Sequence, residues 1–195
     1  MLSRVYRQEV TIELLEYLQT PAVLTALQES ECSLESAFFD APPTQLISDL
    51  AMEYTRLFIG PGKHIPPYES VHVDAGGSLC GQAAVSVKSF IESTGFEYQS
   101  EFQSMPDHIS AELEFMQMLT DQEARMWMKE EQEMALSCLQ TEMAFIDQHL
   151  ARWIPQFCDA VIESQESRFY ASMAALTRDF LAAEKEAIPI QITEI

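Results

Sequence analysis

Two polar side chains, His108 and Glu112, fall on the apolar side of a predicted helix and could do chemistry there. The helix lies in "SMPDHISAELEFMQML", residues 104–119, where Ile109 and Leu113 repeat at the spacing of one helical turn. An imidazole and a carboxylate one turn apart could supply two ligands to a metal ion. They could equally make polar contacts to a bound guest.

Metal chemistry is the weaker of these interpretations. A catalytic zinc site needs a third protein ligand, and the H-E-x-x-H motif is absent. The other histidines are scattered along the chain: His64, His72 and His149. No nucleophile with an adjacent base can be assigned, and the glycine pairs do not form a phosphate-binding loop. We therefore predict no catalytic residue, no metal and no cofactor, and keep a metal-dependent hydrolase using His108 and Glu112 as the alternative from another class of function.

The helix that carries the pair is predicted to begin at Asp107, whose side chain would cap its first turn after the extended Pro106. No Gly or Pro lies between Asp107 and Pro155, so the helix could be nearly continuous up to that proline. We expect a break near 129–133, because a single helix of this length is unusual in a globular domain.

The rest of the chain also predicts helices, and the expected fold class is all-α. We predict one helical domain over 1–195, which could divide into two sub-bundles. The expected helices are 4–19, 22–30, 44–59, 82–95, 156–165 and 167–185, with loops at 60–81 (rich in Gly and Pro) and 96–106 and an extended tail over 188–195.

Composition limits the partners. The 195 residues carry a net charge of −20, so nucleic acid and anionic membranes would be repelled. The four cysteines (Cys32, Cys80, Cys138 and Cys158) form no C-x-x-C motif and are predicted to be reduced core thiols. The first residues do not have the pattern of a signal peptide, and no run is long enough to span a membrane, so we expect a cytoplasmic protein.

Four motifs in this order resemble a known family. They are "EYTRLFIGPG", "PPYESV", "MPDHISAELEFMQML" and "FIDQHLARW", and together they extend over about 53–157. This pattern is similar to that of the TorD/DmsD family of redox-enzyme maturation chaperones, which are related to NarJ-type assembly chaperones.

The resemblance implies an all-helical cytoplasmic chaperone that binds the twin-arginine signal peptide of a molybdopterin-dependent oxidoreductase. It would assist cofactor insertion before export by the Tat pathway, as a monomer or a domain-swapped homodimer that also binds the client's catalytic subunit. A NarJ-type chaperone for a redox subunit that is not exported is the alternative. The implied peptide-binding positions are Leu57, Phe58, Gly60, Pro61, Tyr68, Glu69, Ser70, Pro106, Asp107 and His108.

The residues by themselves favour the same kind of partner. A twin-arginine leader is a cationic segment followed by an apolar one, so its receptor should offer an apolar groove with acidic groups at its rim. The apolar stripe of the 107–120 helix and the strongly acidic 92–142 region would meet this need, with His108 and Glu112 orienting the guest. An acidic structural or regulatory helical module is the remaining alternative.

Overall fold

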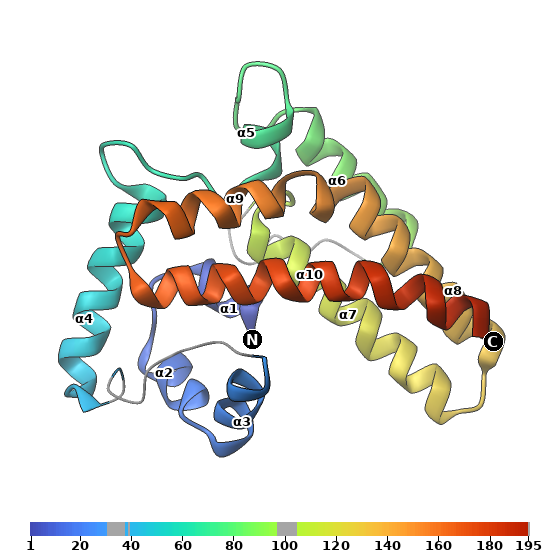
Figure 1. Cartoon of the computed structure of the whole chain (residues 1–195). Coiled ribbons are helices and arrows are strands. Elements are labelled where there is room, and N and C mark those ends of the chain that lie inside the picture. The colour runs from blue at the N-terminus through green and yellow to red at the C-terminus, as the bar shows by residue number, and fades with distance from the viewer. Residues whose placement is uncertain (31–37, 39, 97–104, 195) are drawn as a thin grey trace. The chain divides into compact units, whose positions relative to one another are not determined.

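The computed structural model describes residues 1–30, 38, 40–96 and 105–194, and these residues form helices without a named strand (Figure 1). The predicted all-α fold class is confirmed. The chain divides into two compact units. Unit 1 comprises Met1–Pro67 and Gln156–Arg178, and unit 2 comprises Tyr68–Pro155 and Asp179–Ile195. That residues 1–195 form one domain stays a prediction.

Unit 1 is built on aromatic residues from helices far apart in sequence. Its helices include α1 (Leu2–Arg7), α2 (Ile12–Leu18), α3 (Pro21–Glu29) and α4 (Pro43–Tyr54), which continues into a π-helical turn (Thr55–Ile59). The ring of Phe58 lies edge-on to Tyr6, Tyr54 and Tyr170 with centroids 5.1–6.3 Å apart, and it stacks on Phe157. The Tyr54 hydroxyl donates to the carbonyl of Tyr6 at 2.9 Å, which ties α4 to α1.

The predicted single helix over 4–19 is wrong, because the chain breaks between α1 and α2. Gln8 has extended backbone, and the Thr11 hydroxyl accepts a hydrogen bond from the amide of Leu14 at 3.3 Å. This is an N-cap that starts a new helix. The apolar spacing did not reveal the break, since Val5, Val10 and Leu14 are buried on both sides of it.

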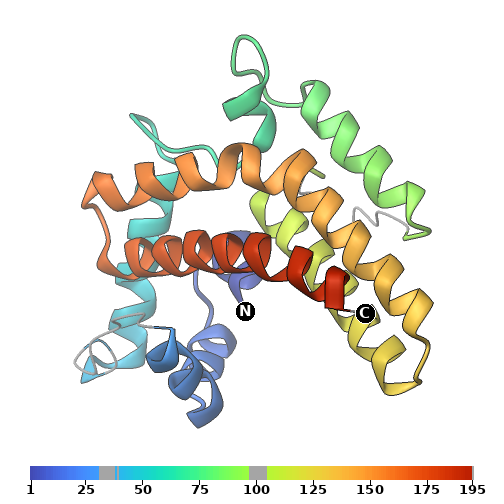
Figure 2. The same ribbon diagram turned by 45° about the vertical axis from the view of Figure 1, so that its right-hand side comes forward.

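Unit 2 contains α5 (Glu69–Val73), α6 (Gln82–Ser93), α7 (Ile109–Met128) and α8 (Gln132–Phe145), which continues into a π-helical turn (Ile146–Leu150). Helices α7 and α8 lie side by side as a hairpin (Figure 2). The predicted break near 129–133 is confirmed, because α7 ends before Lys129 and α8 starts after Glu131. The predicted loop over 60–81 is interrupted by α5, a helix that the Gly and Pro content did not indicate.

Two predicted helix ends are wrong. Pro155 does not end a helix. It lies inside α9 (Ala151–Ser164), the helix that directly follows the second π-helical turn. The expected extended tail is part of α10 (Arg168–Glu194), which includes Pro189. Proline removes one backbone hydrogen bond from a helix, and tertiary packing can outweigh that cost. Ile188, next to Pro189, is 1% exposed and Trp153, near Pro155, is fully buried.

The cysteine prediction holds in part. Cys138 and Cys158 are buried, whereas Cys80 is exposed and Cys32 lies outside the described residues. The loop predicted over 96–106 also falls largely outside them. In the described part of the chain, no helix combines the length and apolar character needed to cross a membrane.

Candidate functional site

Within unit 2, residues 68–70 dock on residues 107–108 through their backbones. Tyr68 and His108 form an isolated antiparallel bridge, and the amide of Glu69 donates to the carbonyl of Asp107 at 2.9 Å. The Asp107 carboxylate accepts from the amide of Ser70 at 3.0 Å. Asp107 therefore caps the first turn of α5, 37 residues earlier in the chain, and the prediction that it caps its own helix is wrong.

His108 is the N-cap of α7 instead. Its Nδ1 accepts a hydrogen bond from the amide of Ser110 at 3.1 Å and lies 2.7 Å from the Ser110 hydroxyl. The Tyr68 ring meets the imidazole edge-on, with centroids 4.9 Å apart. His108 is 5% exposed, so its polar atoms serve the helix start and not an open surface.

Glu69 is a carboxylate with no exposed surface, and it is held by two cationic or titratable side chains. Its Oε2 lies 2.9 Å from Nδ1 of His149, which is itself 1% exposed. Its Oε1 lies 3.5 Å from a guanidinium nitrogen of Arg152. A buried carboxylate must be paired to be tolerated, and here the partners come from the segment 80 residues further along the chain.

Glu112 is also fully buried, and only one of its two carboxyl oxygens has a hydrogen-bond partner among the described residues. Its Oε2 accepts from the indole N–H of Trp153 at 3.1 Å. Burial raises the pKa of Glu112 well above its ordinary value, and the negative charges of Glu69 and Asp107 raise it further. Burial beside the other carboxylates therefore favours the protonated, uncharged form of the Glu112 carboxyl.

Three buried oxygen atoms in this region have no hydrogen-bond partner among the described residues: Ser70 Oγ, Asp107 Oδ1 and Glu112 Oε1. Buried polar atoms normally find a partner, so three such atoms around the contact between residues 68–70 and 107–112 mark an incomplete polar network. We refer to Glu69, Ser70, Asp107, Glu112 and His149 as the buried polar cluster. Chemically it can hold one proton on a carboxyl pair or receive additional hydrogen-bond donors.

Four of the predicted binding residues belong to unit 1 and lie around the π-helical turn. Leu57 and Phe58 are 2% and 5% exposed and belong to the core of the unit. The amide of Gly60 closes the turn by donating to the carbonyl of Thr55 at 2.6 Å. A Cβ atom on Gly60 would lie 3.0 Å from that same oxygen, so only glycine fits this close approach without movement.

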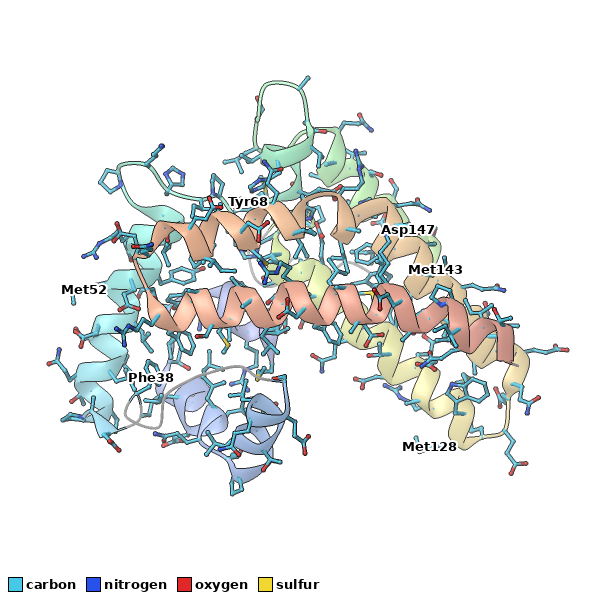
Figure 3. All side chains as sticks on the ribbon, viewed as in Figure 1. Phe38, Met52, Tyr68, Met128, Met143 and Asp147 are labelled. Carbon is cyan, nitrogen blue, oxygen red and sulfur yellow. The ribbon has the colours of Figure 1, made fainter. Side chains whose placement is uncertain are left out.

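Gly60 and Pro61 line a pocket of about 750 Å³ in unit 1. Ala51 and Met52 supply apolar surface on α4, where Met52 is 56% exposed (Figure 3). The charged side chains in the lining are Glu9, Arg56, Lys63 and Glu166. Arg56 and Glu166 form an exposed ion pair at 3.2 Å. We call this the unit 1 pocket.

The structure thus sorts the predicted residues by exposure. Gly60, Pro61, Tyr68 and Pro106 keep accessible surface. Buried positions account for the others: Leu57, Phe58, Glu69, Ser70, Asp107, His108 and Glu112. The sequence analysis did not assign His149, Arg152 or Trp153 to the site. Their presence in the motif "FIDQHLARW", on adjacent helical positions, was the available signal.

Among the described residues, no group of three or more His, Cys, Asp or Glu side chains could hold a metal ion, and the hydrolase alternative gains no support. The chain belongs to the nitrate reductase delta subunit family, whose model matches residues 20–159.

Several relatives carry the same description, chaperone protein TorD. The one from Photobacterium profundum is 32% identical over 129 residues, which is 66% of this chain and 58% of the relative. The one from Aliivibrio fischeri is 28% identical over 68% of this chain and 61% of its own length. This chain therefore spans about three fifths of these two proteins. The match to the TorD protein of Vibrio vulnificus strain YJ016, at 27% identity, covers 95% of this chain and 90% of that relative.

A solved structure agrees with the fold. It is the crystal structure of a candidate redox enzyme maturation protein from Archaeoglobus fulgidus, with a TM-score of 0.57 and 22% identity over 93% of this chain and 94% of the other. The resemblance to redox-enzyme maturation chaperones is confirmed.

Proposed function

We propose that this protein is a cytoplasmic chaperone that binds the twin-arginine signal peptide of a molybdopterin-dependent oxidoreductase and assists cofactor insertion before Tat export. Membership of the family supports the class of function. The observation that carries the peptide-binding role is the unit 1 pocket, because it places two motif residues, Gly60 and Pro61, beside apolar surface and carboxylates.

The pocket has the properties that such a peptide needs. Ala51, Met52 and Pro61 can bury part of an apolar segment, and Met side chains adapt to different sequences. Glu9 can attract an arginine, and the net charge of −20 raises the rate of encounter with any cationic peptide. Arg56 and Lys63 in the same lining would limit the number of positive charges that the pocket accepts.

The eleven predicted residues take two roles in this proposal. Gly60, Pro61, Tyr68 and Pro106 can touch a guest because they keep exposed surface. The buried members hold the 68–70 and 107–108 segments, or the π-helical turn, in position. Glu112 has no exposed surface, so it acts on a guest only through an opening of the buried polar cluster.

A second candidate function is supported by the family description itself. A nitrate reductase delta subunit family suggests an assembly chaperone of the NarJ type, acting on a redox subunit that is not exported. Both candidates have a catalytic subunit as partner, and the protein would act as a monomer or a domain-swapped homodimer. Light scattering at several concentrations tests the oligomeric state.

Isothermal titration calorimetry separates the two functions. The titrants are synthetic twin-arginine leaders from candidate oxidoreductases, each paired with a control in which both arginines are Gln. Binding in the micromolar range or tighter, lost in the control peptide, is expected from the proposed function. Absence of binding by every leader, with the protein folded, would reject it and favour the NarJ-type alternative.

A further inference from the structure

The buried carboxylate of Glu69 has one connection to the surface of unit 2. Two basic side chains contact this carboxylate, and the His149 ring is buried. The other, the Arg152 guanidinium, has 51% of its side chain exposed. The outward oxygen of Glu69 is therefore covered by a cationic side chain that itself reaches solvent.

The contact between Arg152 and Glu69 is loose compared with the other contacts of this acid. The nitrogen–oxygen distance is 3.5 Å, whereas the contact to His149 is 2.9 Å. The same guanidinium nitrogen also donates to the backbone carbonyl of Gln148 at 3.3 Å, so it is shared between two acceptors. A charge-assisted bond of optimal geometry is shorter, near 2.7–2.9 Å. Arg152 is thus an exchangeable partner, because little interaction energy with Glu69 is lost when its guanidinium moves away.

Two buried oxygens without a partner lie near the same place. Asp107 Oδ1 is an acceptor, and Glu112 Oε1 belongs to the carboxyl whose pKa is raised by burial and by the nearby charges of Glu69 and Asp107. A guanidinium carries five N–H donors in a planar fork and can satisfy several carboxyl oxygens at once. Arg152 donates to the carbonyl of Gln148 on its own helix and makes no hydrogen bond to Asp107 Oδ1 or Glu112 Oε1.

We infer that Arg152 is an internal substitute for a guest guanidinium: it covers Glu69 in the free protein, and an arginine of a bound cationic peptide displaces it and completes the buried polar cluster. Exchange of one guanidinium for another keeps the charge of the cluster constant, so it avoids leaving the Glu69 anion unpaired. The identity of the guest as a twin-arginine leader rests on the proposed function. The guanidinium site itself does not.

The test compares Arg152→Gln with Arg125→Gln by calorimetry against the same leader. Arg125 is an exposed residue in the last turn of α7, so its substitution changes the net charge by the same amount without touching the cluster. Removing the competitor should tighten leader binding about tenfold in Arg152→Gln. In Arg125→Gln the change should stay below about threefold. Equal effects of the two substitutions, or weaker binding by a folded Arg152→Gln protein, would overturn the inference.

A second readout needs no leader. N-acetyl-arginine amide is titrated into each protein while the indole N–H signal of Trp153, which donates to Glu112, is followed by NMR. The signal should shift at lower ligand concentration in Arg152→Gln than in the parent, and Arg152→Lys should lie between them, which preserves the comparison if Arg152→Gln does not fold. An unchanged signal in every variant would reject the guanidinium site. A shift with arginine amide but no binding of any leader would reject the proposed function alone.

Discussion

The buried polar cluster of unit 2 and the pocket of unit 1 both contain motif residues, yet they are opposite kinds of site. In the cluster, Glu69, Asp107 and Glu112 have no exposed surface, and their partners come from segments 37 to 83 residues away. In the pocket, Gly60 and Pro61 lie at the surface beside the exposed side chain of Met52. A shared motif therefore does not imply a shared physical role.

The difference predicts whether a substitution lowers the stability of the protein or its affinity for a guest. A polar group removed from the cluster leaves its former partner buried and unpaired, so the free energy of unfolding falls. A side chain removed from the pocket loses contacts mainly with a guest, so the affinity falls and the stability is nearly kept. Four experiments test this contrast.

The largest effect is expected for Glu69→Ala. It leaves His149 buried without its carboxylate, and breaking a buried pair from one side costs about 3–5 kcal/mol. Urea denaturation followed by circular dichroism measures the change. The matched control is Glu166→Ala in the unit 1 pocket, which breaks the exposed ion pair with Arg56 and should cost about 0–1 kcal/mol. Similar losses in both variants would remove the contrast between the two regions.

The next effect concerns the one pocket residue whose role is structural. Gly60→Ala places a Cβ atom 3.0 Å from the carbonyl oxygen of Thr55, and this crowding should cost about 1–3 kcal/mol. Gly62, two residues on, has nothing within 4 Å of the added atom, so Gly62→Ala serves as the control and should leave the melting temperature nearly unchanged. If both variants have the melting temperature of the parent, the close approach of Gly60 to Thr55 does not contribute to stability.

Glu112→Gln should change the pH dependence of stability. The pKa of Glu112 is raised in the folded state, so this acid stabilises the fold below about pH 4.5 and loses that contribution as the pH rises toward the raised value. Glutamine resembles the protonated acid and cannot ionise. The free energy of unfolding of Glu112→Gln should therefore increase relative to that of the parent as the pH rises above about 4.5.

The control for this measurement is Glu133→Gln, which removes an exposed acid from α8. Its free energy of unfolding should follow that of the parent across the same pH range. Parallel curves for Glu112→Gln and the parent would show that Glu112 is ionised in the folded protein, and the cluster would then carry one more negative charge than we describe.

The smallest effect on stability is expected for Met52→Ala in the unit 1 pocket. The side chain is 56% exposed, so its loss should change the free energy of unfolding by less than about 0.5 kcal/mol. Leader binding should weaken several-fold if the apolar segment lies there. Met128→Ala, at an exposed position near the turn between α7 and α8 (Figure 3), is the control and should bind as the parent does. Equal affinities of both variants for the leader would show that the peptide does not bind in the unit 1 pocket.

The sequence determined the elements of this fold more reliably than their ends. Apolar periodicity predicted the helices, and the improbable length of a helix from 107 to 154 predicted the break that Lys129–Glu131 provides. Predictions from single residues failed where packing competes with local preference. Pro155 and Pro189 lie inside helices, and Thr11 starts a helix within a continuous apolar pattern.

The candidate site divides in the same way. The sequence by itself identified His108 and Glu112 as polar residues on an apolar face, and the motifs selected Glu69, Asp107 and Gly60. The roles of these residues follow from contacts that form only in the folded chain. Asp107 caps α5, Glu69 pairs with His149 and Arg152, and Trp153 holds Glu112. The physical reason is that hydrogen bonds depend on distance in space, and the chain separates these partners by 37 to 83 residues, where neither spacing nor composition carries information about contact.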